Sequence, residues 1–121
     1  MDTQRETRPQ ELGDILPFID KSVRELYRFE PGQDPAPIRL LLGRVQQVQE
    51  TLHRRNLTKR YPQLHEVVCF LYLCCFSVVH LGGESFHTYR EEVKLRYKGL
   101  LRSLYFFFRR PRVTKKCMNQ Y

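Results

Sequence analysis

Apolar residues near the start of the chain recur every three or four positions, which is the spacing of one face of an α-helix. The first such row follows Asp14, a residue type that can cap a helix N-terminus. Its members are Leu16, Ile19, Val23 and Leu26, and Ile15 and Tyr27 widen the face. The pattern predicts a first helix that begins close to Asp14 and buries this row.

Residues 30–37 predict a break, because three prolines and a glycine in eight residues cannot continue a helix. Asp34 followed by Pro35 has the order of a capping residue and a proline in the first helical turn. We therefore expect a second helix from about Pro37 to about Arg55, ended by Asn56. Its apolar face comprises Ile38, Leu41, Leu42, Val45, Val48 and Leu52.

The stretch from Val67 to Gly83 carries no charged residue. A helix that is apolar on all sides is either the central helix of a core or a membrane segment. At 1.5 Å per residue this stretch would be about 25 Å long, shorter than the roughly 30 Å hydrocarbon core of a bilayer. Its β-branched and aromatic content also permits a buried strand. No partner strand is evident, so a core helix that stops at Gly82-Gly83 is favoured.

The last apolar row lies among basic residues. Ser85 or Thr88 can cap this helix, since Thr88 and Glu91 have the spacing of a capping box. Pro111 is expected to end it. The predicted apolar face comprises Val93, Tyr97, Leu100 or Leu101, Leu104 and Phe108.

Together these rows predict an all-α protein, a compact bundle of about four helices with a basic C-terminal tail. Residues 1–12 are expected to be a flexible polar arm, residues 13–110 a single helical domain and residues 111–121 the tail. A chain of 121 residues has the length of one ordinary domain. The charge-free helix is expected at the centre, covered by the other three.

Positive charge is concentrated at the end of the chain. From Arg90 to Lys116 there are ten Lys and Arg against two Glu, a balance of 10 − 2 = +8, which equals the formal charge of the whole chain. A basic surface with interleaved aromatics is typical of phosphate-rich ligands. The candidate anion-binding residues are Arg90, Lys94, Arg96, Lys98, Arg102, Arg109, Arg110, Arg112, Lys115 and Lys116. The candidates for base stacking or partner contact are Tyr105, Phe106 and Phe107.

Three of the four cysteines, Cys69, Cys74 and Cys75, lie inside the charge-free stretch. Cysteines clustered in one apolar run do not form a disulfide framework, so we expect reduced thiols. Their interpretation as small core residues is favoured, and lipidation at a membrane is the alternative. Of the His and Cys residues, only His65 and Cys69 have the spacing of paired ligands on a helix, so no metal site is predicted.

No pattern typical of an active site occurs in the sequence. The serines lack a glycine-rich turn around a nucleophile, and no phosphate-cradling glycine loop is present. We therefore expect a non-enzymatic protein without a cofactor.

Two segments resemble viral accessory families. Residues 18–26, followed by a proline-led helix and an apolar helix at similar spacing, resemble the first helix of the primate lentiviral Vpx/Vpr proteins. That family carries tryptophans and a His/Cys zinc site, whereas this chain has no Trp. Residues 69–71 together with residues 92–98 resemble the precoat silencing-suppressor proteins of some geminiviruses. The two resemblances imply a small regulatory protein of viral type and assign no family.

The leading expectation is a small basic interaction or regulatory protein whose last helix and tail engage nucleic acid or another polyanion. The runner-up is a membrane-associated protein, with residues 67–83 as a short apolar helix and the basic helix at the lipid interface. A third interpretation is a viral-type adaptor or host-defence suppressor that docks a host protein through an exposed Phe face. The expected location is nuclear or cytoplasmic, or a membrane surface for the runner-up. A homodimer is compatible with all three.

Overall fold

The computed structural model describes residues 12–120, with side chains over residues 12–104. Within this range every regular element is a helix, which confirms the all-α prediction. The helices in chain order are α2 (Ile15–Arg28), α3 (Ala36–Arg54), α4 (Leu57–Arg60), α5 (Pro62–His80) and α6 (Phe86–Gln120). The fifth element arises because residues 57–60, between the second expected helix and the charge-free helix, form a one-turn helix.

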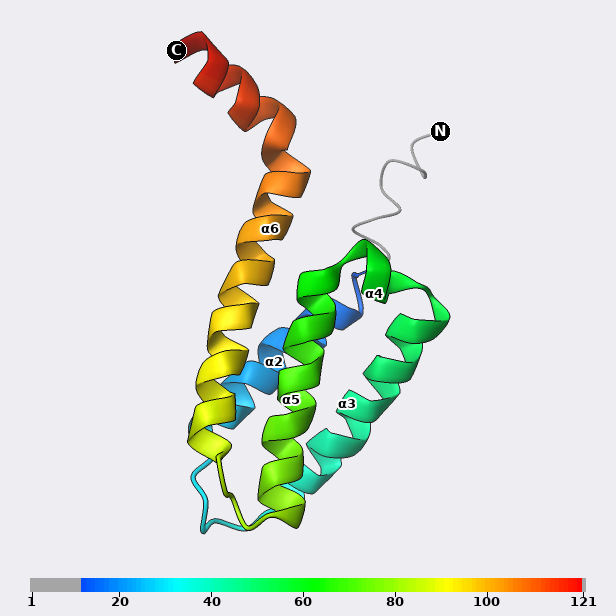
Figure 1. The fold of residues 1–121 in the computed structure, drawn as a ribbon, viewed down its shortest axis with the longest axis vertical. Helices are drawn as coiled ribbons and strands as arrows, with labels where there is room; N and C mark the ends of the chain where they lie inside the picture. The colour runs from blue at the N-terminus through cyan, green and yellow to red at the C-terminus, as the bar shows by residue number, and fades with distance from the viewer. Residues whose placement is uncertain (1–11, 121) are drawn as a thin grey trace.

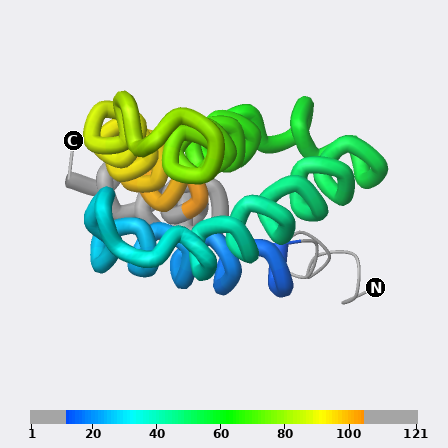
Figure 2. The backbone as a smooth tube through the Cα atoms, turned by 90° about the horizontal axis from the view of Figure 1, so that it is seen from below, coloured from blue at the N-terminus to red at the C-terminus, as the bar shows by residue number. Residues whose placement is uncertain are grey.

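The helices are arranged around α5. Figure 1 shows α5 in the middle, with α6 along one side, α3 along the other and α2 crossing behind. All the other described helices contact α5, and α6 and α3 do so most extensively. Figure 2, seen from below, shows α2 on one side of the bundle and the α5–α6 pair on the other. The fully buried side chains of all five helices meet in one core.

The charge-free stretch forms most of α5, which begins with Pro62 in its first turn. The buried residues of α5 are Leu64, Val67, Val68, Leu71, Cys74, Cys75 and Ser77. This burial supports the prediction of a core helix, although the opposite side of α5 is only half-buried. The helix ends at His80 because Gly82 and Gly83 follow with φ angles of 65° and 86°, a left-handed conformation that suits glycine.

The buried face of α2 differs from the expected row. Ile15, Ile19, Ser22 and Leu26 are buried, whereas Leu16 and Val23 are only half-buried. Burying the polar side chain of Ser22 costs little free energy, because its hydroxyl donates a hydrogen bond of 2.7 Å to the carbonyl of Phe18. The buried face of α2 is therefore rotated about the helix axis toward Ser22. A search for apolar spacing alone does not include this serine.

Local signals placed α3 within one residue of its expected bounds. A carboxylate oxygen of Asp34 accepts the Ala36 N–H at 3.1 Å, as expected of the Asp-Pro pair. Asn56 ends the helix in the left-handed conformation, with φ 59°. The capping role expected of Asp14 before α2 is wrong, because its side chain makes no capping bond. It lies 3.6 Å from Arg55 instead.

The last helix is longer than predicted. It begins after Ser85, one of the two expected caps, and runs through Pro111 to Gln120. The expected end of this helix at Pro111 is therefore wrong, whereas the division of the chain into arm, domain and tail stays a prediction. Proline removes one backbone hydrogen bond and bends a helix, but it does not always end one. Figure 1 shows this helix continuing well past the other four.

Leu71 tests the core assignment, because its side chain is fully buried on α5. We expect Leu71→Ala to lower the free energy of unfolding by about 2–5 kcal/mol, and Leu71→Asp to unfold the protein at neutral pH. Urea unfolding followed by circular dichroism measures both. The matched control is Leu40→Ala, since Leu40 on α3 is 65% exposed and its loss should change stability by less than about 0.5 kcal/mol. A wild-type spectrum for Leu71→Asp would contradict the assignment.

Candidate polyanion-binding face

Three of the predicted cations form a row on α6. Lys94, Lys98 and Arg102 are four residues apart, so they lie on the same side of the helix. All three are exposed. At 1.5 Å per residue the row spans about 12 Å. We call these three residues the cationic row.

Both carboxylates in the first half of α6 have partners within the protein. Glu92 lies 3.3 Å from the guanidinium of Arg96, four residues further along. Glu91 accepts a hydrogen bond of 3.1 Å from the hydroxyl of Tyr27 on α2. Glu92 is thus paired with a cation, whereas Glu91 is exposed three residues before Lys94 and keeps its negative charge at the start of the cationic row.

Arg90 was predicted to bind anions, but the structure places it against the bundle. Its side chain is 14% exposed, and Nη1 lies 3.7 Å from a carboxylate oxygen of Glu30. The same nitrogen is 3.4 Å from the carbonyl oxygens of both Leu26 and Phe29. These carbonyls end α2, where cations are favoured by the helix dipole and by unpaired acceptors.

Two aromatic rings enclose the same guanidinium. Its central carbon lies 4.8 Å from the ring centroid of Tyr27 and 5.2 Å from that of Phe86. Phe86 also packs edge-to-face on Phe29, at 5.6 Å between centroids. Arg90 therefore joins the base of α6 to the end of α2, and we leave it out of the candidate face.

Arg96 is also turned away from the cationic row. Besides Glu92, it lies 3.7 Å from Glu66 on α5, and its guanidinium sits 5.4 Å from the ring centroid of Phe70. Its side chain is still 43% exposed, so these contacts are weak individually. They direct this cation toward α5.

The remaining predicted site residues lie beyond the described side chains. They are the cations Arg109, Arg110, Arg112, Lys115 and Lys116 and the aromatics Tyr105, Phe106 and Phe107. The backbone of these residues belongs to α6. The structure thus brings together three of the ten predicted cations, of which Lys94 also lies 5.8 Å from the ring centroid of Tyr27. It places Arg90 and Arg96 mainly in contacts with α2 and α5, and it describes no side chain of the other five.

The orientation of α6 is set by the turn before it, which sequence reasoning missed. Ser77, fully buried at the end of α5, donates a hydrogen bond through its hydroxyl to the carbonyl of Glu84. Its own carbonyl accepts the N–H groups of Leu81 at 3.0 Å and Gly83 at 2.9 Å. The available signal was a lone serine in an apolar run just before a Gly-Gly pair.

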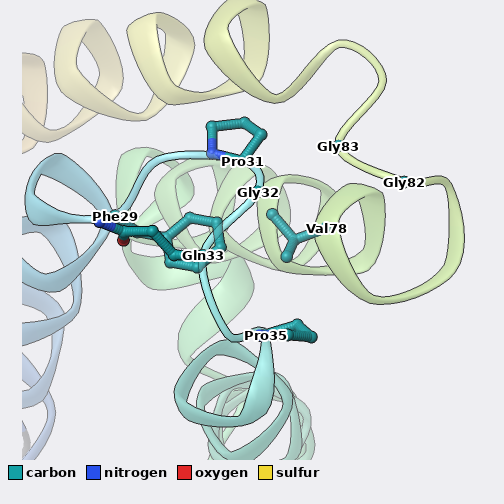
Figure 3. Close-up of a pocket in the computed structure, with 8 residues that line it drawn as sticks. All are labelled: Phe29, Pro31, Gly32, Gln33, Pro35, Val78, Gly82 and Gly83. Atoms are coloured by element: carbon teal, nitrogen blue, oxygen red, sulfur yellow. The ribbon is translucent and has the colours of Figure 1, made fainter.

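A small cavity lies where this turn meets the α2–α3 loop, and Figure 3 shows it in close-up. Its volume is about 160 Å³, and it is lined by Phe29, Pro31, Gly32, Gln33, Pro35, Val78, Gly82 and Gly83. The two loops approach so closely that a Cβ on Gly83 would lie 3.1 Å from Cβ of Pro31. None of the eight lining residues is ionisable, so these side chains supply no acid or base to the cavity.

Tyr97 links α6 to α2 further along. Its hydroxyl donates a hydrogen bond of 2.7 Å to Asp20, which lies 3.0 Å from Arg24. Burial and this bond to a carboxylate raise the pKa of Tyr97 to about 12. Burial likewise raises the pKa of Tyr27, with Glu91 adding to the effect.

The cysteines on α5 are shielded thiols. Burial raises the pKa of Cys74 to about 12 and that of Cys75 further in the same direction. Cys69 is half-buried with its sulfur 3.6 Å from Nε2 of His65, and burial raises its pKa as well. Such thiols are poor nucleophiles at neutral pH. Across residues 12–104 no three His, Cys, Asp or Glu side chains gather as a metal site.

Compared with known proteins, the chain matches no family model, no curated protein and no solved structure. Within the described residues, α5 is the one helix long and apolar enough to cross a membrane by length and composition, and 39% of its most apolar window is buried in the bundle.

Replacing Arg90 tests its structural role. Because Arg90→Met leaves the carbonyls at the end of α2 without their donor, we expect the free energy of unfolding to fall by about 1–3 kcal/mol. Urea unfolding measures the change. Lys98→Met, on the exposed side of the same helix, is the control and should change stability by less than about 0.5 kcal/mol. Equal effects of the two substitutions would contradict the role assigned to Arg90.

The raised pKa of Tyr97 predicts that the folded protein loses stability at alkaline pH. Its pKa is about 12 in the folded protein against 10.0 as the ordinary value, so folding favours the neutral phenol. This contribution is complete below about pH 10 and is lost as the pH rises through 12. Tyr97→Phe should lower stability at neutral pH and make the alkaline loss smaller. Unfolding curves over this range test both effects, with Tyr89→Phe on the same helix as the control; identical pH profiles for wild type and Tyr97→Phe would refute the link.

Proposed function

We propose that this is a non-enzymatic interaction protein that binds a polyanion, nucleic acid in the first instance, through α6. The observation that carries the proposal is the exposed cationic row, Lys94, Lys98 and Arg102, on a helix whose nearby carboxylates already have partners. Regularly spaced cations on a rigid helix release counterions from a phosphate backbone, which drives association without reading bases.

The sequence beyond the row supports the same proposal. Residues 105–121 add five further cations and no acid, and the net charge of the whole chain is +8. Because the backbone of α6 continues to Gln120, these cations follow the row on the same helix. A long basic helix of this kind can follow a phosphate backbone over several nucleotides.

An anionic membrane surface is the second candidate, favoured by two exposed leucines. Leu95 is 60% exposed and Leu101 is 45% exposed, and both lie on α6 among the cations of the row. Lysines over lipid phosphates with leucines in the headgroup region are typical of interfacial helices. A phosphate backbone has no comparable contact for exposed leucines. Replacing Leu95 and Leu101 should therefore weaken binding to a membrane but not binding to nucleic acid.

Binding of the full chain to a fluorescent single-stranded DNA of about 20 nucleotides, measured over a salt series, tests the proposal. We expect affinity to fall steeply with salt. The triple variant Lys94→Gln, Lys98→Gln, Arg102→Gln should bind more weakly at low salt. Its log–log salt slope should be shallower by about 2, since each phosphate contact to a single strand contributes roughly 0.7.

The matched control removes three exposed cations from α2 and α3 instead, as Lys21→Gln, Arg39→Gln, Arg44→Gln. It has the same net charge as the triple variant, so it should retain more of the affinity. Flat affinity across the salt series, or equal losses in the two variants, would count against the row. Flotation with anionic vesicles that is lost in Leu95→Gln, Leu101→Gln, together with weak DNA binding, would favour the membrane candidate.

A further inference from the structure

The outer face of α2 carries a second set of cations. Lys21, Arg24 and Arg28 are spaced by three and four residues, so they lie on one face of the helix. All three are exposed. At 1.5 Å per residue they span about 10 Å, which is close to the length of the cationic row on α6. We call these three residues the α2 row.

The α2 row lies beside the edge of α2 that packs on α6. Asp20 and Tyr27 form hydrogen bonds with Tyr97 and Glu91 of α6, and each comes one position before a cation of the α2 row. One residue turns a helix by about 100°, so the row faces outward next to this contact. Figure 1 shows the two helices meeting at the lower end of the bundle.

Contacts between the two helices bring the two rows together. Nζ of Lys94 lies 5.8 Å from the ring centroid of Tyr27. Further along, one oxygen of Asp20 accepts a hydrogen bond of 2.7 Å from the hydroxyl of Tyr97, and the other lies 3.0 Å from Nε of Arg24. A cation of each row therefore borders the same line of contact between α2 and α6.

The surface that includes both rows keeps a positive balance. The six cations of the rows face two acids that lie between them, Asp20 and Glu91, which gives 6 − 2 = +4. The neighbouring Glu30 and Glu92 are paired with arginines outside both rows. Glu25 lies on the edge of α2 turned away from α6, because it follows Arg24 by one more step of the helix.

The cations of the α2 row are available to a ligand. Across residues 12–104, Lys21 and Arg28 form no ion pair. Arg24 is paired with Asp20, but its side chain is 69% exposed. An exposed pair of this kind contributes little to stability, so a phosphate can compete for the guanidinium.

We propose that the polyanion bound by the cationic row also contacts the α2 row, so that its phosphates lie on both sides of the line where α2 meets α6. This inference rests on the proposed function, because it assigns further contacts to the same nucleic acid. Neighbouring rows of like charge repel each other, and a polyanion that lies across both relieves this repulsion. The α2 row adds about three phosphate contacts, so the affinity should depend more steeply on salt.

Binding of the full chain to single-stranded DNA of about 20 nucleotides, measured over a salt series, tests the α2 row. The variant Arg24→Gln, Arg28→Gln should bind at least about tenfold more weakly at about 50 mM salt. Its log–log salt slope should be shallower by about 1.4, since each of the two lost contacts contributes roughly 0.7. The matched control, Arg39→Gln, Arg44→Gln, removes two exposed arginines of α3 and should change the affinity by less than about threefold.

A second variant excludes an indirect effect through the ion pair of Arg24. Lys21→Gln, Arg28→Gln leaves the pair between Arg24 and Asp20 intact and should show the same loss of affinity. Circular dichroism confirms that each variant is folded. The variant Lys21→Gln, Arg39→Gln, Arg44→Gln removes one cation of the α2 row, so its salt slope should be shallower by about 0.7.

The possible results separate this inference from the proposed function. If both α2 variants bind as tightly as wild type while Lys94→Gln, Lys98→Gln, Arg102→Gln binds weakly, the α2 row is not part of the site and the proposed function stands. Equal losses in the α2 variants and the α3 control would indicate a general charge effect and would also overturn the inference. A wild-type affinity that does not change with salt would overturn both.

Discussion

Burial of one side of α5 is the constraint on which the rest of the structure depends. All the other described helices pack against this helix, and its buried residues run almost its full length, from Leu64 to Ser77. Apolar side chains provide the driving force, roughly 1.5–3 kcal/mol for each fully buried large one. Polar groups on that side find partners nearby: Ser77 bonds to Glu84, and the Cys74 thiol lies 3.6 Å from the carbonyl of Phe86.

The same contacts determine which cations of α6 face solvent. Ser77 and the glycine turn fix where α6 begins, and Arg90 then fastens its first turns to the end of α2. With that side of the helix occupied, the positions four and eight residues after Lys94 project outward. Residues 81–90 thus link the packing of α5 in the core to the positions of the exposed cations on α6.

Much of the fold could be predicted from the sequence, because strong local signals coincided with tertiary packing. The Asp34-Pro35 pair and the leucine-rich row after it located α3 almost to the residue. The face of α2 could not be located as well, since Ile15 and Leu16 fit an apolar row equally and Ser22 fits it badly. For the site, charge alone could not separate Arg90 from Lys94. Their different fates depend on Glu30 and the carbonyls of α2, some sixty residues earlier in the chain.

The length of α6 has a mechanical consequence. Its 35 residues make a rod of about 52 Å, against about 28 Å for the 19 residues of α5. Its first half is held in the core by Val93, Leu100 and Leu104, which are buried. A force applied near its far end would therefore act as on a lever whose pivot is the last of these buried positions, Leu104. The contacts of Leu100 and Leu104 would be strained before those of Arg90 and Phe86 at the base of the helix.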